Sequence, residues 1–189
     1  MRTTLAADLT YLGKRVDTSP SAFGELRSSI ELLQDREALA SRMAEDGYLF
    51  LPGLLKRDEV LAAREEVLRR LDAAGCIHRS FPLLDAVPAA AVQDGVVHKL
   101  AVENEPLEQV VFHGPMMDFH RSFLGGPVLH FDYIWLRAKR PGITDATPPH
   151  YDVVFMGRGT KQLYTSWTPL EDIPLEKGGL MVLENSHKL

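Results

Sequence analysis

The stretch Pro149-His150-Tyr151-Asp152-Val153-Val154 carries the most information about the fold and the chemistry of this chain. It is typical of a β-strand, in which side chains two positions apart point to the same face. His150 and Asp152 would then offer one imidazole nitrogen and one carboxylate oxygen to a single point in space. These are two of the three donors of the 2-His-1-carboxylate set that holds Fe(II), and a His from a later strand would be the third. The alternative is an ordinary His with Asp152 as a nearby hydrogen-bond acceptor.

Upstream of this stretch the spacing of apolar residues predicts helices. We expect them over residues 20–33, 36–46, 56–71 and 105–124, with a break in the last one at Gly114-Pro115. The helix over 56–71 has the clearest signal, because acidic side chains fall in its first turn and basic ones in its last, as the helix dipole favours. A short strand is expected over 48–51, and residues 72–104 have no clear pattern.

Downstream of residue 127 the pattern changes from helices to strands. Strands are predicted over residues 128–139, 150–156, 162–168 and 180–183, separated by turns that contain glycine. Helices followed by strands, without alternation between them, indicate an α+β fold with helices packed on a sheet or a β-sandwich. We expect a single domain over 1–189, made of an N-terminal extension (1–35), a mainly helical part (36–127) and a strand-rich part (128–189).

The composition excludes several classes of protein. The chain has 189 residues, of which 45% are hydrophobic and 25% charged, and its net charge is −5. An acidic chain lacks the positive patch that nucleic acid requires, and no apolar run approaches the roughly 18–20 residues that span a membrane. The single cysteine, Cys76, excludes an intrachain disulfide and a zinc site built on several thiolates. We expect a cytoplasmic protein with neither nucleic acid nor a membrane as partner.

Three groups of residues occur in a fixed order along the chain. They are Glu45-Asp46-Gly47-Tyr48-Leu49-Phe50-Leu51-Pro52-Gly53-Leu54-Leu55 before the charged helix, the pair in His150-Tyr151-Asp152, and Trp167-Thr168-Pro169-Leu170-Glu171-Asp172 leading to Gly178-Gly179-Leu180-Met181-Val182-Leu183-Glu184-Asn185-Ser186-His187. In this order and spacing the chain resembles the phytanoyl-CoA dioxygenase family of Fe(II)/2-oxoglutarate oxygenases, whose fold is a double-stranded β-helix, or jelly roll. The resemblance covers residues 36–71 and 128–189, and it implies N-terminal helices packed on a partial jelly roll.

The resemblance also implies a hydroxylase of a small organic molecule, with Fe(II) as its metal and 2-oxoglutarate as its co-substrate. His150 and Asp152 would bind the iron. Trp167 would line the 2-oxoglutarate pocket, and an ordinary core aromatic is the alternative for this residue. On the preceding strand Tyr133 and Arg137 share one face by alternation, so both are candidates for contact with the co-substrate. Arg137 could alternatively pair with a surface carboxylate.

The chain departs from the family pattern in two places. Glu184-Asn185-Ser186-His187 stands where the family usually has Pro-Gly-Ser-His. The third iron ligand of the family, a His, and the Arg that pairs with 2-oxoglutarate would follow residue 189. We therefore expect the first part of such an enzyme, with a truncated jelly roll over 128–189. Its unpaired strand edges favour poor solubility or homo-oligomers.

Other interpretations stay open at the level of sequence. A non-catalytic remnant or binding module would keep the fold without the iron, and a cupin-like isomerase or hydrolase would use another divalent ion. His187 could substitute as the third metal ligand. His113, His120 and His130 are expected to be structural, and a place in the lining of a substrate cavity is the alternative for His120.

Overall fold

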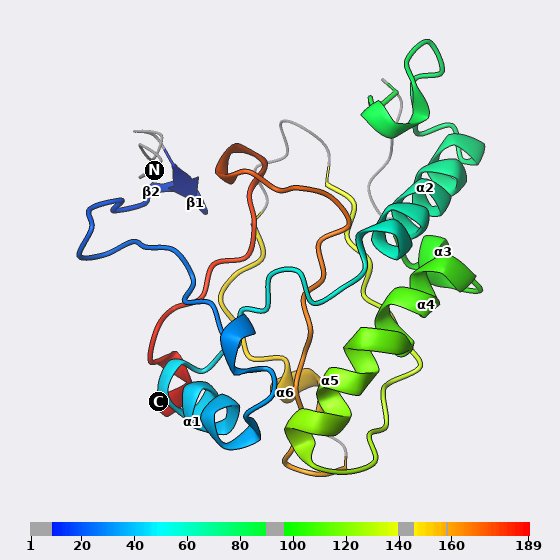
Figure 1. Cartoon of the computed structure of the whole chain (residues 1–189). Helices are drawn as coiled ribbons and strands as arrows, with labels where there is room; N and C mark the ends of the chain where they lie inside the picture. The colour runs from blue at the N-terminus through cyan, green and yellow to red at the C-terminus, as the bar shows by residue number, and fades with distance from the viewer. Residues whose placement is uncertain (1–8, 90–96, 140–145, 158) are drawn as a thin grey trace.

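The computed structural model of the chain describes residues 9–89, 97–139, 146–157 and 159–189. Helices α2 (Arg57–Ala73), α3 (Val97–Ala101), α4 (Glu105–Phe112) and α5 (Gly114–Leu124) follow one another along one side of the molecule, and α1 (Arg36–Asp46) lies beside the C-terminus (Figure 1). The remaining elements are short: β1 (Thr10–Tyr11), β2 (Lys14–Arg15), the helical turn α6 (Val153–Met156) and the 3-10 helices η1 (Ile30–Leu32), η2 (Leu83–Asp85), η3 (Leu175–Lys177) and η4 (Ser186–Lys188). No helix within the described ranges is long and apolar enough to cross a membrane.

Caps and breaks in the sequence set the ends of the predicted helices. The Asp35 carboxylate accepts a hydrogen bond from the Ala38 amide at 2.9 Å and caps the N-terminus of α1. Gly47 ends α1 with a left-handed φ of 79°, which a glycine adopts without strain. The helix predicted over 105–124 is two helices, because Pro115 in the first turn of α5 has no amide hydrogen to continue the bonds of α4. Three of the four predicted helices are thereby confirmed.

The core of the molecule lies where α2 packs against α4. Ala63 of α2 is buried against Leu107 and Val110 of α4, and α3 closes the cluster with Ala101. In the part of the chain that the structure describes, every buried side chain lies between Ser29 and Phe123. The apolar burial that stabilises the fold is therefore concentrated in the helices.

The turn between α3 and α4 is tied to α2 by polar contacts. Arg70 donates hydrogen bonds to the carbonyls of Val102 and Glu103, both at 2.7 Å. Asn104 is fully buried, accepts a hydrogen bond from the Leu107 amide at 3.1 Å and donates one to the Leu100 carbonyl at 2.9 Å. These contacts pair backbone groups that the two helix ends leave without partners.

The strands predicted downstream of residue 127 are not formed in the structure. Among the described residues the only sheet is the hairpin of β1 and β2, so the expected partial jelly roll is not confirmed. Residues 153–156 turn into α6, where the amides of Phe155 and Met156 donate to the Asp152 carbonyl at 2.9 and 3.1 Å. The prediction of a strand over 150–156 is therefore wrong. A strand needs a partner for its amides, and here local hydrogen bonds satisfy them instead.

Two expectations near the N-terminus are also wrong. The helix predicted over 20–33 is reduced to the single turn η1, because Gly24 and the serines at 28–29 are poor helix formers. The Ser29 amide instead donates to the Phe50 carbonyl at 2.8 Å. The strand predicted over 48–51 survives only as the bridge between Ser28 and Phe50.

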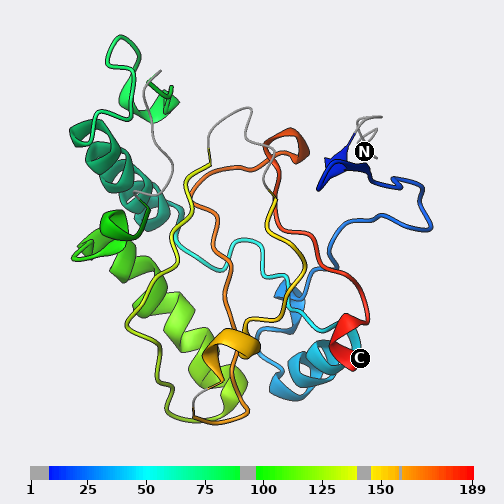
Figure 2. The ribbon, with the colours of Figure 1, turned by 180° about the vertical axis from the view of Figure 1, so that it is seen from behind.

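The segment 128–139 runs along α4 and α5 and keeps the alternation that the sequence predicts, although it has no ladder (Figure 2). Ile134 and Leu136 face the helices and pack against the core cluster. Tyr133 and Trp135, between and beside them, are 45% and 44% exposed. One face of the segment is thus held by the helices, and the other is presented to solvent.

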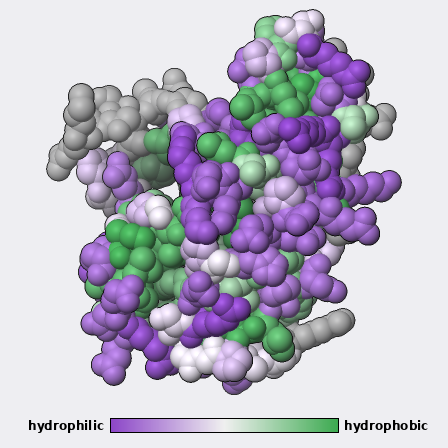
Figure 3. All heavy atoms as spheres, turned by 45° about the vertical axis from the view of Figure 1, so that its right-hand side comes forward, coloured by the Kyte–Doolittle hydropathy of each residue, from purple (hydrophilic) through white to green (hydrophobic). Residues whose placement is uncertain are grey.

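Large apolar side chains reach the surface of the C-terminal third. Leu129 is 97% exposed, Val154 73% and Phe155 72%. Figure 3, which brings the side of α2 to α5 forward, shows further apolar patches among hydrophilic residues there. Patches of this kind favour association with another surface.

Candidate functional site

His150 and Asp152 meet in the structure, through a turn and not through a strand. The Nε2 atom of His150 lies 3.2 Å from Oδ1 of Asp152, and the side chains are 43% and 27% exposed. Asp152 precedes the first residue of α6, so the helical turn brings its carboxylate back toward the imidazole. The two candidate donor atoms therefore lie next to each other.

A hydrogen bond at Nδ1, the ring nitrogen that faces away from Asp152, fixes the tautomer of His150. Nδ1 lies 2.8 Å from the carbonyl oxygen of Pro148, and a carbonyl accepts only, so Nδ1 carries the hydrogen. In the neutral ring Nε2 then presents a lone pair to the Asp152 carboxylate. Two acceptors at this separation require a proton or a cation between them.

The chemistry of this donor pair fits a divalent metal. An octahedral ion with ligands at roughly 2.1 Å holds two neighbouring donor atoms roughly 3 Å apart, close to the separation seen here. A metal-bound His commonly donates its second N–H to a carbonyl, as His150 does to Pro148. Phe155 places its ring edge-on to the imidazole, with 6.2 Å between ring centroids.

Two tyrosine hydroxyls tie the loop that carries the pair to other segments. Tyr11 of β1 donates to the carbonyl of Thr147 at 2.8 Å. Tyr151 donates to the carbonyl of Ser186 in η4 at 2.5 Å. Sequence patterns do not reveal either contact, because the partners are backbone atoms of distant segments.

A third metal donor is not brought to the pair within the described ranges. No group of three His, Cys, Asp or Glu side chains there is close enough to hold a metal ion. His187, considered above as a substitute ligand, lies at the end of α1 with Nε2 at 3.0 Å from the Ala44 carbonyl.

The residues predicted to meet the co-substrate are all accessible. Tyr133 lies edge-on to Trp135 with 5.8 Å between ring centroids, on the face of 128–139 that points away from the helices. Arg137 is exposed on the same segment. Trp167 is 50% exposed, which does not fit the alternative of a core aromatic.

His120 occupies a polar position within an aromatic cluster. Its Nδ1 donates to the Met116 carbonyl at 2.8 Å, so Nε2 accepts from the Ser166 hydroxyl at 3.3 Å. Phe123 and Tyr164 pack edge-on nearby with 5.2 Å between centroids. The cluster joins α5 to the segment that carries Trp167. His130 lies outside this cluster and stacks on the Phe112 ring, with 3.9 Å between ring centroids.

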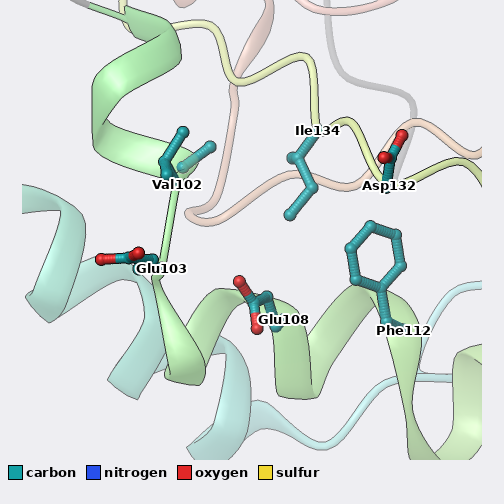
Figure 4. Close-up of a pocket in the computed structure, with 7 residues that line it drawn as sticks. Val102, Glu103, Glu108, Phe112, Asp132 and Ile134 are labelled. Atoms are coloured by element: carbon teal, nitrogen blue, oxygen red, sulfur yellow. The ribbon is translucent and has the colours of Figure 1, made fainter.

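A separate small pocket of about 120 Å³ lies between the α3–α4 turn and the segment 128–139 (Figure 4). Neither His150 nor Asp152 lines it. Its lining combines the acidic residues Glu103, Glu108 and Asp132 with the apolar residues Val102, Phe112 and Ile134.

Comparison with known proteins places the sequence in a family. The chain is 30% identical over 169 residues to the 1-deoxypentalenic acid 11-beta-hydroxylase of Streptomyces exfoliatus, an alignment that covers 83% of this chain and 56% of the relative. It is 28% identical over 174 residues to the enzyme of the same name from Streptomyces arenae, covering 88% and 59%. The chain therefore spans little more than half the length of these curated relatives. No solved structure is significantly similar to it.

The family match covers most of the chain. Residues 43–189 match the sequence model of the phytanoyl-CoA dioxygenase (PhyH) family. This range includes the end of α1, all later helices and the His150–Asp152 pair. The chain therefore belongs to the phytanoyl-CoA dioxygenase family.

Proposed function

We propose that this chain functions in the hydroxylation of a small organic molecule, with Fe(II) as its metal and 2-oxoglutarate as its co-substrate. The observation that carries the proposal is the His150–Asp152 pair, whose donor atoms lie 3.2 Å apart. Membership of the phytanoyl-CoA dioxygenase family supports it, as do the names of two relatives, both hydroxylases of 1-deoxypentalenic acid.

His150 Nε2 and the Asp152 carboxylate would hold the metal. Bound Fe(II), together with 2-oxoglutarate and O₂, supplies the oxidation that converts a C–H bond into a C–OH bond. The Pro148 carbonyl keeps the imidazole in the tautomer that leaves Nε2 free to bind. A 2-His-1-carboxylate site requires one further His. The titration described below asks whether this chain supplies it.

Trp167, Tyr133 and Arg137 are proposed to bind 2-oxoglutarate. Arg137 offers a cationic fork that matches a carboxylate of the co-substrate. Tyr133 offers a hydroxyl from the same face of its segment. Trp167 offers an exposed apolar ring that can cover the carbon chain of the co-substrate and exclude water.

The proposal is tested by an anaerobic titration of the chain with Fe(II) in the presence of 2-oxoglutarate. We expect the visible metal-to-ligand charge-transfer band to grow with added iron and to saturate. His150→Ala should abolish the band. His78→Ala is the matched control, because His78 follows the C-terminal end of α2 and should leave the band unchanged.

Absence of the band in a folded wild-type chain would overturn the proposal and favour a non-catalytic binding module. A band that persists in His150→Ala would move the metal to other residues. If the band behaves as expected, 1-deoxypentalenic acid is the first substrate to test, because both relatives are named for it.

A further inference from the structure

The C-terminal turn η4 is docked on the end of α1. Figures 1 and 2, which view the molecule from opposite sides, both place η4 beside α1. The Nε2 atom of His187 donates a hydrogen bond to the carbonyl of Ala44 at 3.0 Å. Ala44 lies in the last turn of α1, where carbonyls have no partner within the helix. His187 thus acts as a C-terminal cap for α1, although it lies 143 residues after Ala44 in the sequence.

The imidazole of His187 lies directly over Gly47. A Cβ atom added at Gly47 would come closer than 3.0 Å to three ring atoms, Nδ1, Cγ and Cε1. Gly53 offers a comparison: its φ is 78°, against 79° at Gly47, but an added Cβ there meets nothing within 4 Å. Gly47 is therefore required twice, for its left-handed backbone and for the space that His187 fills.

The same turn contacts the loop that carries the candidate metal donors. Ser186, next to His187, accepts the hydrogen bond from the Tyr151 hydroxyl. Tyr151 lies between His150 and Asp152 in the sequence. A continuous set of contacts thus runs from the end of α1 through η4 to the pair.

We propose that His187 is a positioning residue: by anchoring η4 on α1 it fixes the loop that presents His150 and Asp152. The docking stands on the contacts alone. Its effect on metal binding rests on the proposed function. The role differs from that of a metal ligand, because Nε2 is bonded to the Ala44 carbonyl and Nδ1 lies against Gly47.

The docking is tested by thermal unfolding of four variants: Gly47→Ala, Gly53→Ala, His187→Ala and the double variant Gly47→Ala/His187→Ala. Gly53→Ala reports the backbone strain alone. We expect Gly47→Ala to lower Tm by roughly 2–4 °C more than Gly53→Ala does. In the His187→Ala background this excess should vanish, because the ring is gone. An excess that persists in that background would overturn the docking.

The positioning role is tested by hydrogen exchange in the full chain. The amides of Val154, Phe155 and Met156 are bonded to Tyr151 and Asp152 carbonyls and report on the loop. We expect His187→Ala to speed their exchange roughly three- to tenfold. His187→Gln, whose amide N–H can still reach the Ala44 carbonyl, should restore much of the protection. Lys188→Ala is the control within η4, because the Lys188 side chain bonds Asn185 and not α1.

Measurements of Fe(II) affinity distinguish a failure of this inference from a failure of the proposed function. If the wild-type chain binds Fe(II), His187→Ala should weaken binding roughly tenfold, and His187→Gln should weaken it less. If the wild-type chain binds no Fe(II), the proposed function fails, and the exchange measurement still decides whether His187 positions the loop. Unchanged exchange and unchanged affinity in His187→Ala would overturn the inference and leave the proposed function intact.

Discussion

Arg64 on α2 and Glu171, 107 residues later in the chain, form an ion pair with 3.1 Å between guanidinium and carboxylate. The Arg64 side chain is only 15% exposed, and Lys177 approaches the same carboxylate at 3.2 Å. This pair joins the helical core to the segment that follows Trp167. The coupling free energy of this ion pair therefore reports how strongly the segment after Trp167 is attached to α2.

We expect a double-mutant cycle of Arg64→Ala and Glu171→Gln to give a coupling free energy of about 1 kcal/mol in urea unfolding. The exposed pair of Arg69 and Glu65, at 2.6 Å within one helix, is the control and should couple by less than about 0.5 kcal/mol. Equal coupling energies for the two pairs would mean that partial burial adds nothing to the first.

Arg70 should matter more to stability than its neighbour Arg69. Arg70→Ala leaves the carbonyls of Val102 and Glu103 without their charged donor, so we expect the free energy of unfolding to fall by about 1.5–3 kcal/mol. Arg69→Ala removes only a surface pair and should cost less than about 0.5 kcal/mol. Chemical denaturation of both variants provides the measurement, and similar losses in the two would contradict the role assigned to Arg70.

Two helix caps of different burial allow a matched comparison. Asn104→Ala removes a fully buried cap and also the donor to the Leu100 carbonyl, so a loss of about 2–3 kcal/mol is expected. Asp35→Ala removes an exposed cap from α1 and should cost about 1 kcal/mol. Urea titration followed by circular dichroism distinguishes the two. A larger loss at Asp35 would show that burial does not set the cost.

The candidate metal donors should affect binding and not stability. Both side chains are partly exposed and lie outside the core, so His150→Ala and Asp152→Ala should change the free energy of unfolding by less than about 0.5 kcal/mol. The same variants should abolish or strongly weaken Fe(II) binding in the titration with 2-oxoglutarate. A variant that unfolds the chain would point to a structural role for the pair.

The exposed apolar side chains of the C-terminal third should drive self-association. We expect the sedimentation coefficient to rise with protein concentration, because exposed apolar side chains such as Leu129 and Val154 can contact other copies of the chain. Leu129→Lys and Val154→Lys should each reduce this dependence. Leu39→Met, a buried and volume-conserving change, is the control and should leave it unaltered. A clean monomer at all concentrations would contradict the prediction.

The sequence predicted the helices well, because their signals are local. Asp35, Gly47 and Pro115 each act within one turn of the chain, and the helices begin, end or break where these residues stand. The failed helix over 20–33 was also decided locally, since Gly24 and the serines weaken it. The prediction of this helix relied on the spacing of apolar residues and gave too little weight to these poor helix formers.

The sequence predicted the strands poorly, because a strand depends on partners that lie elsewhere in the chain. The run over 150–156 has strand-forming side chains, yet its amides bond locally and form α6. For the candidate site, the convergence of His150 and Asp152 is present in the structure, whereas the place of His187 on α1 has no local signal. A contact between a side chain and a distant backbone carbonyl produces no recognisable spacing of residue types in the sequence.

The absence of buried residues after Phe123, within the described ranges, has a consequence for how this protein can evolve. Most substitutions that lower stability act through buried cores. Among the described residues after Val128, changes at exposed side chains that do not contact the helices, unlike Ile134, Leu136 and Glu171, should therefore alter thermal stability little. Such changes can alter what the segment with the candidate site binds while the packed helices keep the chain folded.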